Sequence, residues 1–351
     1  MPKTLPNLSD ALKDSSRPVF LFGSVPPKAG TTIEDAIQTC AKFTARSSVL
    51  ATDGFIVYDI QDEGARTNVE RPFPFRKTMD AAIYGALFPG LSGKQCVIYK
   101  SVVEDGAATF SDWIDTACGK YKHNAFNLVG SPTSRIQDTG LKLHEAGDIM
   151  KARKDCAFGC VAIAERHITK GNENINMLRK MEFGADWFIT QGVFASGPIS
   201  KLLNDYGDLC RQNNVVPKKV ILTFAPCGRP KTLSFIKWLG MFVPEEVEKR
   251  IFDASVPVRE SMVLLKEILL SILEATGNSG VPIGINVESL SIFKDEIDAA
   301  HDLFQSLQVS IINPFKFFFA QSWHWYVIIV ITTITGGYVK WTRITLGRAL
   351  V

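Results

Sequence analysis

Polar side chains that could do chemistry stand near the ends of short apolar runs in this chain. Gln191 closes "DWFITQ", Glu165 closes "CVAIAE" and Ser131 closes "AFNLVGS". Asn286 and Glu288 lie at the end of a fourth run, "PIGINVE". A carboxyl group in a cleft can exchange a proton with a bound molecule, and a carboxamide can both donate and accept hydrogen bonds. Glu165 and Glu288 are therefore candidate acid–base residues, and Gln191 is a candidate binding residue.

Eight apolar runs of this kind recur along the chain. They span residues 19–25, 54–60, 96–102, 125–131, 160–165, 186–191, 219–225 and 282–288. Because they lack strict polar alternation, they suit strands buried on both faces of a parallel sheet. Amphipathic stretches separate them, and this alternation predicts a closed (β/α)8 barrel of the TIM type. A doubly wound open sheet is the alternative, but no GxGxxG motif follows any run. In a barrel the polar strand ends would meet at one mouth.

Composition narrows the range of partners and sites. The chain has 351 residues, of which 21% are charged, with a net charge of +3. No basic stripe interleaved with aromatic residues is present, so we expect no nucleic-acid partner. No Ser-His-Asp order with supporting context, GxSxG or HExxH motif occurs. His123, His144 and His301 lie in polar stretches and are expected to face solvent.

The cysteines indicate a reducing compartment. Seven are scattered without framework spacing, and an odd count of this kind is typical of reduced thiols. Cys156 and Cys160 in "DCAFGC" could be half of a metal site, but no second cysteine or histidine pair completes it. We therefore interpret them as core cysteines and expect no bound metal.

The carboxyl-terminal segment has the pattern of a membrane anchor. Residues 323–339 contain no Asp, Glu, Lys or Arg, with Trp323 and Trp325 at one end and Lys340 and Arg343 at the other. Aromatic belts with basic flanks are typical of a helix that spans a bilayer, and about 17 uncharged residues are the minimum for a span. The pattern predicts one transmembrane helix. A buried terminal helix or strand is the alternative.

These features predict a linear organisation of the chain. The amino-terminal extension covers residues 1–17 and lacks the apolar core of a secretory signal. The expected parts that follow are a barrel at 18–310, a linker or interfacial segment at 311–322, the transmembrane helix at 323–341 and a basic tail at 342–351.

The segment "GADWFITQGVF" (184–194) resembles a motif of the methylenetetrahydrofolate reductase family, FAD-linked oxidoreductase barrels that reduce a folate. Supporting stretches follow in the family's order: "PPK" (26–28), "AERH" (164–167), "NMLRKMEFGAD" (176–186) and "WLGMFVPEEV" (238–247). The resemblance covers residues 18 to 306 and identifies the chain as a divergent member with an added membrane segment.

The resemblance implies roles for particular residues. The family's folate-binding glutamine falls on Gln191, whose amide could meet a pterin edge. Its cofactor-contacting histidine and lysine fall on His167 and Lys180. Gly130 and Ser131 occupy the positions that lie beside the flavin ring in the family.

The chain also departs from the family pattern. The glutamate that protonates the folate nitrogen in the family is replaced by Gly23, and glycine cannot hold a proton. The aspartate near the flavin ring is replaced by Ser131, and the aromatic residue that stacks on the cofactor is replaced by Ile163. Three such losses favour a barrel that no longer performs this chemistry and has lost FAD.

The preferred interpretation is a non-catalytic, membrane-anchored barrel that serves as an accessory subunit of a membrane complex. Its partners would be the other subunits and the lipid bilayer, and the mitochondrial inner membrane is the preferred location over another organelle membrane. The alternative is an active flavin-dependent oxidoreductase that reduces a folate or related substrate with NAD(P)H. In that case FAD would be bound, and Glu165 or Glu288 would supply the proton.

Overall fold

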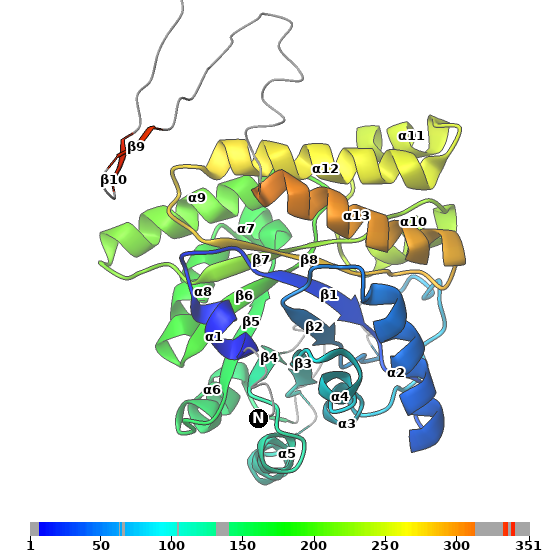
Figure 1. Cartoon of the computed structure of the whole chain (residues 1–351), viewed down its shortest axis with the longest axis vertical. Helices are drawn as coiled ribbons and strands as arrows, with labels where there is room; N and C mark the ends of the chain where they lie inside the picture. Colours follow the sequence, from blue (N-terminus) through cyan, green and yellow to red (C-terminus); the bar gives the residue numbers. More distant parts are fainter. Residues whose placement is uncertain are drawn as a thin grey trace, which may run out of the picture. The chain divides into compact units, whose positions relative to one another are not determined.

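The computed structural model of the chain describes residues 7–62, 64, 67–103, 105–130 and 140–312, and the backbone of 333–335 and 338–340. The chain divides into two compact units, Met1–Gln308 and Val309–Val351. The first unit holds the barrel (Figure 1).

Eight parallel strands form a closed barrel in the order of the sequence. They are β1 (Phe20–Ser24), β2 (Gly54–Val57), β3 (Cys96–Ser101), β4 (Ala125–Val129), β5 (Ala157–Ala162), β6 (Ala185–Gly192), β7 (Lys219–Phe224) and β8 (Ile283–Val287). The barrel closes where β1 pairs with β8, with Leu21 opposite Asn286. The predicted (β/α)8 barrel is therefore confirmed.

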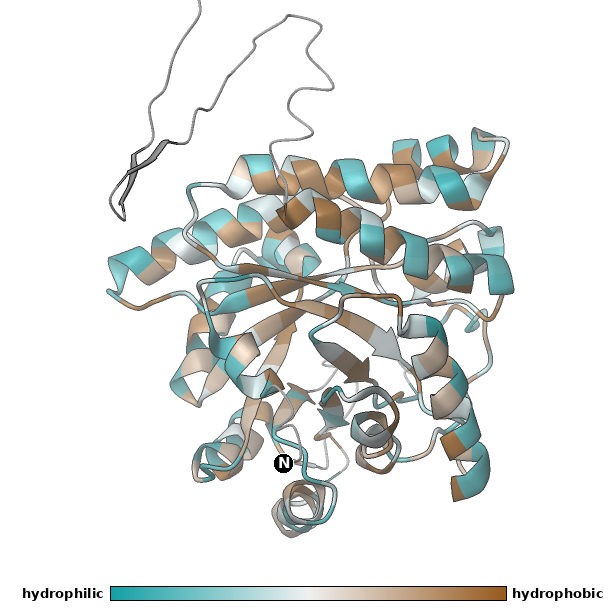
Figure 2. Cartoon of the chain, in the orientation of Figure 1, coloured by the Kyte–Doolittle hydropathy of each residue, from teal (hydrophilic) through white to brown (hydrophobic). Residues whose placement is uncertain are grey.

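At least one helix follows every strand and covers the outside of the barrel (Figure 1). The helices are α1 (Leu8–Lys13), α2 (Ile33–Ser47), α3 (Ala81–Gly85), α4 (Phe88–Ser92), α5 (Ala107–Gly119), α6 (Leu143–Lys151), α7 (Ala164–Lys170), α8 (Glu173–Glu182), α9 (Ser196–Gln212), α10 (Pro230–Trp238), α11 (Glu245–Asp253), α12 (Pro257–Thr276) and α13 (Lys294–Ile312). Figure 2 shows apolar residues concentrated on the strands and both polar and apolar residues along the helices. This distribution is what a barrel covered by helices requires.

Side chains that stabilise helix starts are encoded locally. Thr32 precedes α2, and its hydroxyl accepts a hydrogen bond from the Asp35 amide at 3.2 Å. Asp80 precedes α3 and accepts from the amides of Ala82 and Ile83 at 2.8 and 3.1 Å. Such caps satisfy amides that have no partner within the helix, and each stabilises its helix by about 1 kcal/mol.

Alternate strand residues fill the interior of the barrel. Leu21, Ile56, Val97 and Ile221 are buried in one apolar cluster with the indole of Trp187. A large ring fits here because its neighbour on β5 is Gly159: a Cβ at that position would lie 2.2 Å from the indole. The interior is a packed core rather than a pore, as in other barrels of this type.

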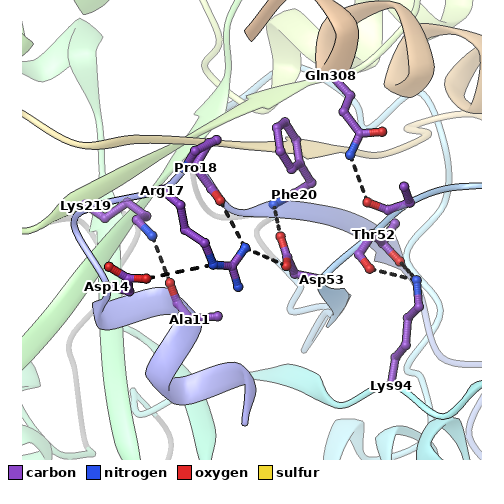
Figure 3. Close-up of polar contacts among 11 residues, drawn as sticks. Ala11, Asp14, Arg17, Pro18, Phe20, Thr52, Asp53, Lys94, Lys219 and Gln308 are labelled. Carbon is purple, nitrogen blue, oxygen red and sulfur yellow. Dashed lines mark hydrogen bonds and ion pairs between the residues drawn. The ribbon is translucent and has the colours of Figure 1, made fainter. Parts of the chain in front are cut away.

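Helix α1 closes the amino-terminal end of the barrel. Leu8 and Leu12 pack into the interior cluster, and the Lys219 ammonium on β7 donates to the Ala11 carbonyl at 2.8 Å (Figure 3). Arg17 then bonds Asp53 at 2.8 Å, which ties the following segment to the barrel (Figure 3). Burial lowers the pKa of Lys219 to about 8. The predicted amino-terminal extension thus covers the amino-terminal end of the barrel. The opposite, carboxyl-terminal end is the mouth.

The second unit contains two short strands. β9 (Thr333–Thr335) and β10 (Tyr338–Lys340) pair antiparallel. They fall within the segment 323–341, for which the sequence predicts a transmembrane helix. The rest of that segment, residues 313–322 of the linker and the basic tail 342–351 lie outside the described residues. Among the helices that the structure describes, none is long and apolar enough to cross a bilayer.

Candidate functional site

A polar cluster lies inside the barrel near its carboxyl-terminal mouth. It comprises Tyr58, Tyr99, Thr223, Asn286 and Glu288, and we name it the Tyr58–Glu288 cluster. The Asn286 amide donates to the Tyr58 hydroxyl at 2.9 Å and to the Thr223 hydroxyl at 3.3 Å. The rings of Tyr58 and Tyr99 meet edge to face, with centroids 4.9 Å apart. Strands β3, β7 and β8 and the residue directly after β2 therefore contribute to one connected group.

Glu288 is the acidic member of this cluster. It follows β8 directly, its backbone amide donates to the Phe224 carbonyl at 3.0 Å, and the residue is only 8% exposed. Burial raises the pKa of its carboxyl to about 7, against a smaller opposing effect of the Tyr58 hydroxyl. The same burial raises the pKa of Tyr58 well above 10. A carboxyl group of this kind is poised to exchange a proton near neutral pH.

Gly23, the position where the family's acid is missing, faces this same cluster from β1. A Cβ built on Gly23 would lie 2.9 Å from the Glu288 Cβ and 2.9 Å from the Tyr58 ring. The glycine therefore provides the room that these two side chains occupy. The sequence predicts an acid lost at position 23, and the structure places another carboxyl group immediately beside it.

Gln191 lies at an irregularity in β6. The register with β7 pairs Ile189 with Ile221 and then shifts, so that Gly192 pairs with Thr223. The Thr190 hydroxyl accepts the Thr223 amide at 3.0 Å in place of a regular ladder bond. Bulges of this kind redirect side chains and are common beside active sites.

Gln191 and Glu165 line one small pocket together with Thr190, Phe194 and Ile199. Its volume of about 10 Å³ is room for about one water molecule. Glu165 was expected at a strand end, but it lies in the first turn of α7, because β5 begins and ends earlier than predicted. Its carboxylate accepts the Phe242 amide at 3.4 Å, and burial raises its pKa. Of the three candidate residues predicted from the sequence, Gln191 and Glu165 therefore line one pocket. Glu288 belongs to the Tyr58–Glu288 cluster.

Buried polar atoms without partners point into the barrel interior. Asn127 on β4 is fully buried, and neither its carbonyl oxygen nor its amide nitrogen has a hydrogen-bond partner among the described residues. The Asn286 carbonyl oxygen and the Trp187 indole nitrogen are also buried without a hydrogen-bond partner among the described residues. Buried polar groups are normally satisfied, so these atoms mark places for water or a polar ligand. Asn127 was not singled out from sequence, although it is the one polar residue within "AFNLV".

The residues expected to contact a flavin are tied to other parts of the protein. His167 is buried and its Nε2 lies 2.7 Å from the Asp205 carboxylate on α9. The Lys180 ammonium donates to the Val161 carbonyl at 2.7 Å and pairs with buried Glu173 at 3.2 Å. A flavin phosphate would have to compete with Glu173 for the Lys180 ammonium, and a flavin ribose with Asp205 for His167. Their cofactor role stays a prediction.

The other expected flavin-side residues give less information. Gly130 follows β4, and a Cβ there would lie 3.4 Å from Leu143, an ordinary contact. Ser131 lies outside the described residues.

A segment after β2, residues 67–80, reaches α10, which follows β7, and we name it the strap. The Trp238 indole on α10 donates to the Val69 carbonyl at 2.9 Å, and Phe73 packs edge to face on Phe235. The Arg71 guanidinium lies about 5 Å above three rings, including that of Trp238 at 5.0 Å. β1 and β8 lie between β2 and β7 in the barrel, so the strap connects elements on either side of Gly23 and Glu288.

Comparison with solved structures finds a folate-binding barrel among the proteins that this chain resembles. The chain is similar to a protein from Clostridium thermocellum, described as uncharacterized and as binding two copies of 5-methyl-5,6,7,8-tetrahydrofolic acid. The TM-score is 0.72 and the identity 29%, over 87% of this chain and 99% of that one. This chain is thus a (β/α)8 barrel with a folate-binding structural neighbour.

Other solved structures are more distant. A GH113 beta-1,4-mannanase has a TM-score of 0.48 at 12% identity, over 83% of this chain and 98% of its own. Dihydropteroate synthase from Xanthomonas albilineans has a TM-score of 0.42 at 11% identity, over 85% and 94%. Neither similarity is strong enough to carry an argument about this chain. No protein-family profile and no curated protein sequence matches it.

Proposed function

We propose that this chain binds a reduced folate at the carboxyl-terminal mouth of its barrel. The observation that carries the proposal is the similarity, over nearly the whole length of both chains, to a barrel that binds methyltetrahydrofolate. At 29% identity the similarity extends beyond the fold, which by itself would not indicate a ligand.

The polar groups at the mouth suit a pterin ring. A pterin presents ring nitrogens, an amino group and a carbonyl oxygen along one edge. The Gln191 amide can pair with such an edge, since it both donates and accepts. The unpaired polar atoms of Asn127 and Asn286 offer further contacts deeper in the barrel. The rings of Tyr58 and Tyr99 supply an apolar surface beside the carboxyl group of Glu288.

An accessory role without catalysis is the preferred form of the proposal. It is supported by the contacts of His167 and Lys180, which tie both residues to neighbouring helices and strands. Attachment to a membrane complex is supported by the sequence of 323–341 alone. The mitochondrial inner membrane is the preferred location because the scattered cysteines indicate a reducing compartment.

A second candidate function is an active oxidoreductase that reduces a folate. The observation that favours it is the carboxyl group of Glu288 beside Gly23, buried and able to hold a proton near neutral pH. FAD, if bound, would supply the hydride, and Glu288 would deliver a proton to the folate ring. Glu165 is the weaker candidate for that role, since its carboxylate already accepts the Phe242 amide.

Thermal unfolding of the full-length chain in mild detergent tests the proposal. Methyltetrahydrofolate should raise the unfolding temperature, because a ligand that binds only the native state stabilises it, whereas a glutamate-containing peptide of similar charge should not. The same preparation separates the two candidate functions. Visible absorption of a bound flavin together with folate-dependent NAD(P)H oxidation would establish the oxidoreductase, and their absence alongside folate binding would support the accessory role.

A further inference from the structure

Two cysteines from different elements meet at the amino-terminal end of the barrel, away from the mouth. Cys118 is near the end of α5, and Cys156 immediately precedes β5. Both Sγ atoms and a carboxylate oxygen of Asp155 lie within 4.8 Å of one another. Cys118 is 7% exposed, while Cys156 is half-buried and so gives small molecules access to the pair.

The surroundings of this pair favour a thiolate. The hydrogen bond from Cys156 lowers the pKa of the Cys118 thiol, and the nearby Arg153 guanidinium acts in the same direction. Arg153 is itself held in place by ion pairs with Asp115 and Asp155. A thiolate beside a cation and within reach of a second thiol is the arrangement of oxidation-sensitive cysteines.

The other five cysteines lack this combination. Burial raises the pKa of each of their thiols, and all are buried: Cys40, Cys96, Cys160, Cys210 and Cys227. Any oxidation of this chain should therefore begin at the pair on α5 and β5.

A metal ion fits the cluster less well than a disulfide. Both carboxylate oxygens of Asp155 accept hydrogen bonds from Arg153, at 3.1 and 3.0 Å. A metal bound here would have to compete with that guanidinium and lie next to its positive charge. The two sulfurs alone do not complete a tetrahedral zinc site.

We propose that Cys118 and Cys156 are a modification site, a dithiol that closes to a disulfide on exposure to a peroxide. The Cys118 thiol releases its proton, the thiolate attacks one peroxide oxygen and the O–O bond breaks. The hydroxide that leaves takes up the proton released by Cys118 and becomes water. The Cys156 sulfur then attacks the resulting sulfenic acid, forms the S–S bond and expels a second hydroxide, which takes up the Cys156 proton. Two thiols are oxidised and one hydrogen peroxide is reduced to two waters.

The test is peroxide treatment of the full-length protein, alkylation of remaining thiols and mass spectrometry of unreduced peptides. We expect a cross-linked peptide pair containing Cys118 and Cys156 that dithiothreitol separates. Cys156→Ser should remove the cross-link and leave a sulfenic acid on Cys118 that dimedone traps. Cys160→Ala is the matched control, four positions along the chain, and should keep the cross-link. Arg153→Gln should slow its formation by about tenfold.

Two results would overturn the proposal. One is recovery of both cysteines as alkylated thiols when other cysteines have been oxidised. The other is stoichiometric zinc, bound by the wild type but not by Cys156→Ser, that protects both sulfurs from peroxide, because it would make the cluster a metal site. Neither result bears on folate binding at the opposite end of the barrel.

Discussion

Gly23 and Glu288 share one space at the barrel mouth, where β1 and β8 lie side by side. A Cβ on Gly23 would lie 2.9 Å from the Cβ of Glu288, closer than such atoms normally approach. The missing side chain and the buried carboxyl group are thus parts of one arrangement, which includes the Tyr58 ring. Replacing the glycine should therefore disturb the carboxyl group directly.

Gly23→Ala should destabilise the protein and weaken folate binding. Overpacking of a buried site costs about 1–3 kcal/mol. Chemical denaturation should therefore show a lower free energy of unfolding, and the displaced Glu288 should bind the ligand less well. Gly90→Ala is the control, since a Cβ there would have no atom within 4 Å other than those of its chain neighbours and its own helix backbone. Equal effects of the two substitutions would contradict the packing described here.

Glu288 should make stability depend on pH. The pKa of its carboxyl rises from the ordinary 4.5 to about 7 in the folded protein. The folded state therefore keeps a proton that the unfolded state releases, and the resulting stability is fully present below about pH 4.5 and is lost as the pH rises through 7. The shift corresponds to about 3 kcal/mol. Glu288→Gln should remove this pH dependence when the free energy of unfolding is measured between about pH 5 and 8, the range in which the folded carboxyl group loses its proton. An unchanged pH profile in the variant would assign the dependence to another group.

Lys180 and Glu173 should behave as a buried ion pair. Removing one partner of such a pair costs about 3–5 kcal/mol, because the other charge is left unpaired. Lys180→Met alone should therefore destabilise the protein strongly, and adding Glu173→Gln should recover part of the loss in a double-mutant cycle. Independent, additive effects on the free energy of unfolding would instead leave Lys180 available for a cofactor.

The strap should slow the release of a ligand from the mouth. Arg71→Ala removes a guanidinium that contacts three aromatic rings, a loss of about 1–2 kcal/mol. Stopped-flow fluorescence should show faster dissociation of methyltetrahydrofolate from this variant, by about tenfold, with little change in association. Lys266→Ala, on α12, is a control for loss of a positive charge. An unaltered dissociation rate in Arg71→Ala would show that the strap does not cover the bound ligand.

The periodicity of apolar runs was enough to predict the barrel, because strands buried on both faces leave a strong pattern. The boundaries of β5 were predicted less accurately, because "CVAIAE" contains both the end of this strand and the first turn of α7. Two of the histidines expected to face solvent are buried: His123 lies 2.8 Å from the Ala82 carbonyl, and His301 packs on Phe22 at 4.7 Å. These histidines were predicted to be exposed because polar residues lie beside them in the sequence, and that pattern gave no sign of their burial in the fold.

The site could be predicted only in part. Gln191 and Glu288 were found because a polar residue at a strand end is visible in the sequence. The closeness of Gly23 and Glu288 was not, since β1 and β8 come from opposite ends of the barrel sequence and meet only when it closes. The contribution of Tyr58 and Tyr99 was hidden for a similar reason, because aromatic residues in strands usually belong to the core.

Isothermal titration of the full-length chain, in mild detergent, with methyltetrahydrofolate tests the central claim most directly. The account predicts saturable binding, with an affinity that falls by about tenfold or more in Gln191→Ala, since a lost hydrogen bond to a buried ligand costs about 1–3 kcal/mol. An absence of binding at ligand concentrations up to about 1 mM, which corresponds to roughly 4 kcal/mol, would contradict it.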